Sequence, residues 1–170
     1  MAVSVDHYRI RNDDGTQATA TWKALEDVSA TVQNAITFRV RVSYSEPGAN
    51  PTYVNQWEAN KNGGAFADVT TVSANVKAVN SVNVTDGTAT TSQLTNALTF
   101  VAGEITTDGL CPAKALVGNS TQDELVCQTV GAAIGDVFII RPKTVTTFLV
   151  QPTVTVGSGA TKLLPLLGVG

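Results

Sequence analysis

The stretch Ile36-Thr37-Phe38-Arg39-Val40-Arg41-Val42-Ser43-Tyr44 decides the fold class. Every second residue of these nine is apolar, and the residues between them are polar. Side chains alternate between the two faces of a β-strand, so a period of two over nine residues predicts a half-buried antiparallel strand. The apolar face is expected in the core, and Thr37, Arg39, Arg41 and Ser43 are expected on a solvated sheet face.

Similar runs extend over most of the chain in both directions. The chain contains 24 Thr and 23 Val, β-branched residues that pack well on pleated sheets and lose rotamer freedom in helices. We read about nine or ten short strands and no convincing helix. The candidates for these strands are twelve strand-like runs: 5–11, 17–23, 28–32, 36–44, 52–59, 65–69, 75–84, 98–105, 113–117, 124–130, 137–141 and 148–156.

This pattern predicts one all-β domain over residues 1–157. An antiparallel two-sheet β-sandwich with Greek-key, immunoglobulin-like or jelly-roll connections fits best, and a closed barrel is the alternative. Pro152 interrupts the last run, so that strand is expected at a sheet edge or with a bulge. Residues 158–170 are expected to form a separate, flexible apolar C-terminal arm after a glycine-serine joint.

The distribution of charge argues against a nucleic acid partner, and the absence of a long apolar run argues against a membrane partner. The net charge is −3, and charged residues make up only 15% of the chain. Phosphate binding needs clustered basic residues, whereas Arg9, Arg11, Arg39 and Arg41 occupy alternating strand positions. No apolar run approaches the length of a membrane span, and the start has no secretory pattern. We therefore expect a protein made and used without signal-dependent export.

The sequence contains no convincing candidate for a catalytic centre. His7 is the single histidine, and nothing near it indicates an activated nucleophile. The turn at residues 12–15 fails as a calcium loop at the first ligand and at the bidentate glutamate. The adjacent pairs Asp13/Asp14, Glu26/Asp27 and Asp123/Glu124 should point to opposite faces, since neighbours in a strand do. We predict no enzyme activity, catalytic residue, metal site or cofactor.

The two cysteines leave an alternative open. Cys111 and Cys127 form a disulfide only if the fold brings them within reach. Two buried free thiols are the other interpretation, and the spacing does not decide between them.

Two groups of residues are candidates for binding. Tyr53 and Trp57 are four residues apart, so on a regular strand they share a face. They are either an aromatic platform for a sugar or an aromatic pair in the core. Leu163, Leu164, Leu166 and Leu167 must be buried somewhere, either on their own sandwich or on a neighbouring subunit.

Several segments together resemble β-sandwich virion structural proteins of tailed bacteriophages. These segments are 8–15, 18–22, 36–42, 62–69, 84–94 and 100–104. The resemblance covers most of residues 8–156 and rests on strand and turn motifs, so it carries over no functional residues.

The resemblance implies a non-enzymatic capsid decoration or cement protein, assembled in the host cytoplasm and located in the virion. Its partners would be the major capsid protein or other virion subunits, and a homo-oligomer, with a trimer favoured, is expected. A tail or fibre component and a carbohydrate-binding adhesin module are the alternatives.

Overall fold

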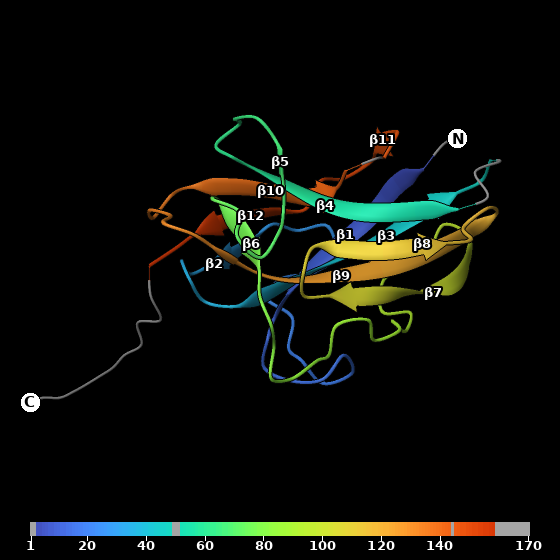
Figure 1. Ribbon diagram of the computed structural model, residues 1–170, viewed down its shortest axis with the longest axis horizontal. Helices are drawn as coiled ribbons and strands as arrows, with labels where there is room; N and C mark the ends of the chain where they lie inside the picture. Colours follow the sequence, from blue (N-terminus) through green and yellow to red (C-terminus); the bar gives the residue numbers. More distant parts are fainter. Residues whose placement is uncertain (1–2, 49–51, 144, 159–170) are drawn as a thin grey trace, which may run out of the picture.

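The computed structural model describes residues 3–48, 52–143 and 145–158, and these residues form two packed β-sheets. No helix occurs in these ranges. The strands are β1 (Ser4–Asn12), β2 (Ala30–Val32), β3 (Phe38–Glu46), β4 (Tyr53–Lys61), β5 (Ala67–Asp68), β6 (Val76–Ala78), β7 (Thr99–Thr106), β8 (Leu110–Lys114), β9 (Asn119–Thr129), β10 (Val137–Pro142), β11 (Thr147–Phe148) and β12 (Thr153–Val156) (Figure 1). The predicted β-sandwich is confirmed.

The first sheet has the order β11-β1-β3-β9-β6, and β7 also pairs with β9. Strand β3 is central and pairs antiparallel with both β1 and β9, in register Arg41↔Arg9 and Arg41↔Glu124. The eleven residues of β9 are long enough for β6 and β7 to share its other edge. The β7–β9 and β1–β11 pairs are parallel, so this sheet is mixed rather than purely antiparallel.

The second sheet has the order β2-β12-β10-β4-β5, and β8 also pairs with β4. The β2–β12 pair is parallel, and the remaining pairs of this sheet are antiparallel. The chain crosses from the first sheet to the second between β7 and β8, at a turn that contains Gly109. The φ of Gly109 is +93°, and a Cβ there would lie 1.9 Å from the Val69 carbonyl oxygen, so only glycine fits.

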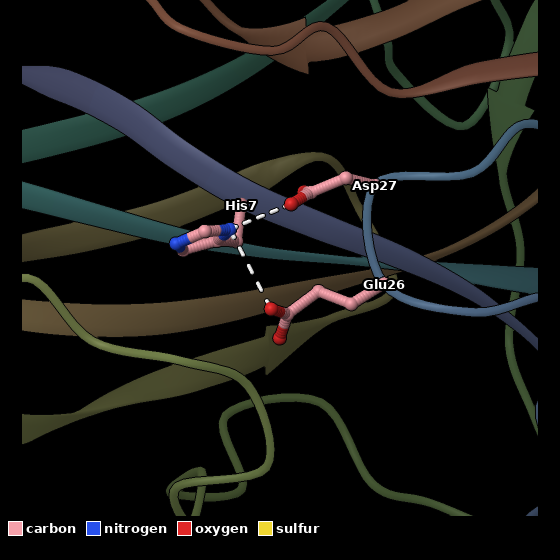
Figure 2. A group of neighbouring side chains, drawn as sticks. All are labelled: His7, Glu26 and Asp27. Atoms are coloured by element: carbon pink, nitrogen blue, oxygen red, sulfur yellow. Dashed lines mark hydrogen bonds and ion pairs between the residues drawn. The ribbon is translucent and has the colours of Figure 1, made fainter.

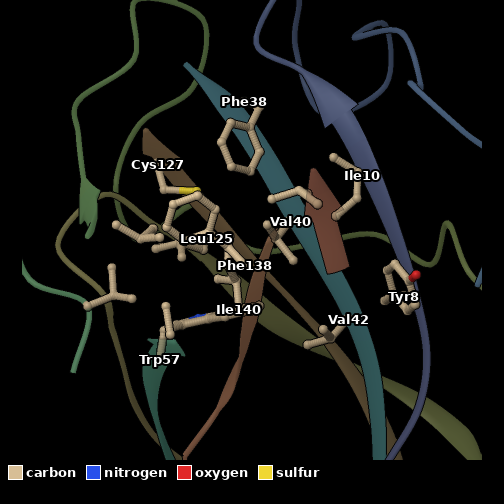
Figure 3. Packing of buried hydrophobic residues seen from close by; sticks show 14 of the residues in the cluster. Tyr8, Ile10, Phe38, Val40, Val42, Trp57, Leu125, Cys127, Phe138 and Ile140 are labelled. Carbon is tan, nitrogen blue, oxygen red and sulfur yellow. The ribbon is translucent and has the colours of Figure 1, made fainter. Parts of the chain in front are cut away.

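The hydrophobic core lies between the two sheets. The alternation in 36–44 places Phe38, Val40 and Val42 in it, each at most 1% exposed. Figure 3 shows these side chains packed with Tyr8 and Ile10 of β1, Leu125 and Cys127 of β9, Trp57 of β4, and Phe138 and Ile140 of β10. In each central strand, the apolar residues at every second position thus lie on the inner face of the sheet.

Three predicted strands differ from the structure. Residues 17–23 form turns, with one isolated bridge between Trp22 and Arg11. Of the run 75–84, only Val76–Ala78 is a strand. The run 148–156 is divided: Thr147–Phe148 joins the first sheet and Thr153–Val156 the second. Pro152 lies at this division, where its missing N–H ends the ladder, and β12 is an interior strand rather than an edge.

In the described ranges, no helix has the length and apolarity needed to cross a membrane.

Candidate functional site

The outer face of the β1–β3–β9 sheet is covered by two loops, residues 13–29 and residues 79–98. Figure 1 shows these blue and green loops side by side below the sheet. They are joined to each other, since Gln17 Nε2 donates to Ala89 O at 3.0 Å and Gln93 Nε2 donates to Gln17 O at 2.6 Å. All nine residues of β3 are buried as a result.

Under these loops lies a charged layer made of Arg11, Arg39, Arg41, Glu124 and Asp13. Glu124 is at its centre and is fully buried. The Glu124 carboxylate accepts from Arg41 Nε at 2.9 Å and from an Arg39 terminal nitrogen at 3.4 Å, and Arg11 lies 3.6 Å away. Arg39 also donates to Asp13 at 2.6 and 2.8 Å. Burial lowers the pKa of the Arg11 guanidinium below its ordinary value.

The prediction of a solvated arginine face is therefore wrong for these positions: Arg39 and Arg41 are 0% exposed and Arg11 is 1% exposed. The loops supply acceptors that water would otherwise provide. Arg41 donates to Thr91 O at 3.0 Å and to Gln17 Oε1 at 2.9 Å. Buried charges persist only when they are paired and hydrogen-bonded, and here loops distant in sequence meet that condition.

A second polar cluster, the Asp123 cluster, lies on the opposite, inner side of β9. It consists of Tyr44, Asn55, Lys114 and Asp123, contributed by four different strands. The Tyr44 hydroxyl and Asn55 Nδ2 both donate to Asp123 Oδ2, the second at 3.0 Å. Lys114 Nζ lies 3.3 Å from each carboxylate oxygen. Burial raises the pKa of the Tyr44 hydroxyl, and the neighbouring Asp123 charge adds to this shift.

The backbone of β7 closes the Asp123 cluster. The Glu104 N–H donates to Asp123 Oδ1 at 2.8 Å. A Cβ on Gly103 would lie 2.1 Å from Gln122 O and 2.2 Å from Asp123 Oδ1. Glycine at 103 is thus required for β7 to approach β9 closely enough to bind the carboxylate.

A third group joins His7, Glu26 and Asp27 at the surface (Figure 2). His7 Nδ1 is 2.7 Å from Asp27 Oδ2 and 3.5 Å from Glu26 Oε2. Imidazole nitrogen and carboxylate oxygen atoms are also ligands for divalent cations. The same carboxylates also hold backbone: Asp27 Oδ1 accepts from Tyr8 N at 3.0 Å, and Glu26 accepts from Thr95 N at 2.9 Å. The group thus fastens both covering loops to the strand that carries His7.

The adjacent carboxylate pairs have different outcomes. Asp123 and Glu124 point to opposite faces of β9, into two separate clusters, as strand alternation predicts. Asp13 binds Arg39 while Asp14 binds Thr21. For Glu26 and Asp27 the prediction is wrong, because they lie in a loop, where no alternation applies, and both converge on His7.

A hollow of about 370 Å³ lies between the two covering loops. Its lining is neutral: Thr16, Gln17, Ala18, Asn83, Val84, Thr85, Thr88 and Thr91. These side chains offer hydroxyl and amide groups but no ionisable group.

The aromatic platform for sugars is not present as predicted. Tyr53 and Trp57 do share a face of β4, but that face is the inner one, and the two side chains are 3% and 0% exposed. A sugar ring needs an open aromatic face to stack on. Both side chains belong to the core instead, where the ring of Tyr53 packs against that of Tyr44 with 5.2 Å between ring centroids.

The remaining candidate residues divide between the described and undescribed parts of the chain. Cys111 and Cys127 are both buried and free. Burial raises the pKa of each thiol above its ordinary value. The four leucines of the predicted arm, Leu163, Leu164, Leu166 and Leu167, lie outside the described residues.

No family model, no curated protein and no solved structure matches this chain.

Proposed function

We propose that this protein is a non-enzymatic structural component of a bacteriophage virion, a decoration protein that braces the shell through protein–protein contacts. The leucine-rich C-terminal segment is its attachment element, and the sandwich is a rigid body that carries it. A homotrimer bound to the major capsid protein is the assembly we expect.

The observation that carries this proposal is the composition of one end of the sandwich. The loop at 33–37 and the loop at 130–136 meet there, since Ala132 N donates to Asn34 Oδ1 at 3.0 Å. The end of β12 joins them: Gly135 N donates to Val156 O, and Gly157 N donates to Val32 O, each at 2.8 Å (Figure 1).

Two large apolar side chains are exposed in these loops. Ile36 is 56% exposed and Ile134 is 72% exposed. The sequence continues from this end into four leucines within five residues, 163–167. Exposed apolar side chains at the end of the sandwich from which the sequence runs into these leucines favour an interface with another subunit.

The charged layer supports a scaffold role. Its arginines donate to carboxylates and loop carbonyls, so their charge serves to hold the loops on the sheet rather than to bind a ligand. A subunit that braces a shell has to bear force without local unfolding. Loops that move are typically regions of low local stability, so a loop held by ion pairs and hydrogen bonds suits this role.

Immunogold electron microscopy of virions from the source host tests the location. Label over the shell supports a decoration protein, and label on the tail would transfer the proposal to a tail or fibre component. Virions without label, together with binding of the isolated protein to soluble glycans, would contradict the virion proposal.

Light scattering of the purified chain tests the attachment element. Replacing Leu163, Leu164, Leu166 and Leu167 with serine should reduce the oligomer to a monomer that keeps its β-sheet circular dichroism. Val82→Ser is the matched control, because Val82 is 100% exposed on the covering loop and its loss should leave the oligomer intact.

A further inference from the structure

Lys114 and Asp123 bring an amine into contact with a carboxyl group inside the sandwich. Lys114 Nζ is 3.3 Å from both Oδ1 and Oδ2 of Asp123. The Asp123 side chain is 0% exposed and that of Lys114 only 12%. Because the carboxyl carbon is bonded to both of these oxygens, the amine nitrogen also lies close to that carbon, which is the proximity that acyl transfer needs.

Hydrogen-bond donors surround the Asp123 carboxyl group. Oδ2 accepts from the Tyr44 hydroxyl and from Asn55 Nδ2, and Oδ1 accepts from the Glu104 N–H at 2.8 Å. Three fixed donors polarise the carbonyl and stabilise the negative charge that develops on oxygen when a nucleophile adds to its carbon. The pair therefore sits in surroundings suited to acyl transfer as well as to a simple ion pair.

Attack on the carboxyl carbon needs the neutral amine, which a proton transfer within the pair supplies. Separating charge in a low-dielectric interior is costly, and moving one proton from the ammonium to the carboxylate removes both charges. A neutral lysine amine shielded from water is a nucleophile. Tyr44 is placed to carry protons, since its hydroxyl is bonded to Asp123 Oδ2 and lies 3.4 Å from Lys114 Nζ.

We propose that Lys114 and Asp123 react with each other to form an intramolecular isopeptide bond. After one proton passes from Nζ to the carboxyl group, the Nζ lone pair attacks Cγ and a C–N bond forms. A second proton leaves Nζ through the Tyr44 hydroxyl for the departing oxygen. The C–O bond then breaks, and one water is released. The carboxylic acid and amine become an amide and water, with no change of oxidation state and no co-reactant.

The bond would join the two layers of the sandwich. Lys114 is the last residue of β8, which pairs with β4 of the second sheet, and Asp123 is in β9 of the first sheet. Both cysteines are free, so among the described residues this amide would be a side-chain cross-link between the sheets that no disulfide provides. The proposal does not depend on the virion assignment.

Intact-mass spectrometry of the denatured full-length protein is the test. We expect a mass lower than that of the sequence by one water, and a proteolytic digest containing a branched peptide that joins Lys114 to Asp123. A wild-type protein with the full sequence mass would overturn the proposal, because an ion pair leaves the mass unchanged.

Three variants show which residues lose the water. Lys114→Arg keeps the charge but has no nucleophilic amine, and it should restore the full mass. Lys143→Arg, at an exposed ion pair with Asp68, should retain the deficit. Tyr44→Phe keeps the ring and removes the proton carrier, so the bond should form many times more slowly.

Dehydration at an Asp-Gly sequence also removes one water, and the chain contains Asp14-Gly15, Asp86-Gly87 and Asp108-Gly109. Hydroxylamine opens such a succinimide but leaves an amide intact. A deficit that hydroxylamine abolishes, or that maps to one of these sites, would contradict the isopeptide bond.

Discussion

Arg41 and Glu124 face each other directly across the β3–β9 pair, and Arg41 Nε donates to Glu124 Oε1 at 2.9 Å with neither side chain exposed. Three guanidinium groups share this one carboxylate, which makes Glu124 the residue on which the charged layer depends.

Replacing Glu124 should therefore destabilise the fold severely. Glu124→Gln leaves Arg11, Arg39 and Arg41 buried with their central countercharge removed. Breaking a buried pair in this way costs about 3–5 kcal/mol. Urea unfolding measures the loss. Asp68→Asn is the control, because its ion pair with Lys143 is nearly half exposed and is worth less than about 1 kcal/mol. Equal losses in both variants would contradict the central role of Glu124.

Asp14 should make stability depend on pH. The Thr21 hydroxyl and the Thr21 N–H both donate to its carboxylate and hold its pKa below the ordinary value. A carboxyl whose pKa is lower in the folded state contributes stability above its unfolded pKa. That contribution is lost as pH falls through the folded pKa.

Thr21→Val tests this dependence. The Asp14 pKa, followed by carbon NMR of the carboxyl, should rise toward its ordinary value. The variant should be less stable than the wild type at neutral pH and equally stable once the carboxyl is protonated. Thr71→Val, at an exposed loop position, is the control. A stability difference that persists unchanged in acid would mean that Thr21 acts through packing instead.

Trp57 should be a core residue rather than a binding residue. Trp57→Ala removes a fully buried ring from between the sheets and should cost about 3–5 kcal/mol in unfolding free energy. Leu149→Ala, at a residue 67% exposed, should change the unfolding free energy by less than about 0.5 kcal/mol. Quenching of Trp57 fluorescence by glycans in the folded protein would contradict this assignment.

Both thiols should be unreactive in the native state. Cys111 and Cys127 are 0% exposed, and burial raises their pKa values, so little thiolate is present and reagents cannot reach it. Ellman's reagent should detect no thiol in the folded protein and two after denaturation. Fewer than two after denaturation without reductant would indicate a disulfide.

Sequence periodicity predicted the central strand of the first sheet well, whereas the equally long runs 75–84 and 148–156 are strands only in part. Strand β3 was predicted within two residues at each end, and its apolar positions from Phe38 to Tyr44 all lie in the core. Residues 17–23 alternate equally well and still form turns. Alternation describes which residues could share a face, but pairing with a neighbouring strand decides whether a strand forms.

The sequence by itself determined that this protein is all-β and which side of its central strands is apolar, because side-chain alternation is a local property of the extended backbone. Only the tertiary structure decided the surroundings of the polar residues. Arg39 and Arg41 are buried because the loops at 13–29 and 79–98 both close over them, and Lys114 meets Asp123 because β8 crosses to the other sheet. Contacts of that kind depend on how distant segments pack, and no local pattern encodes them.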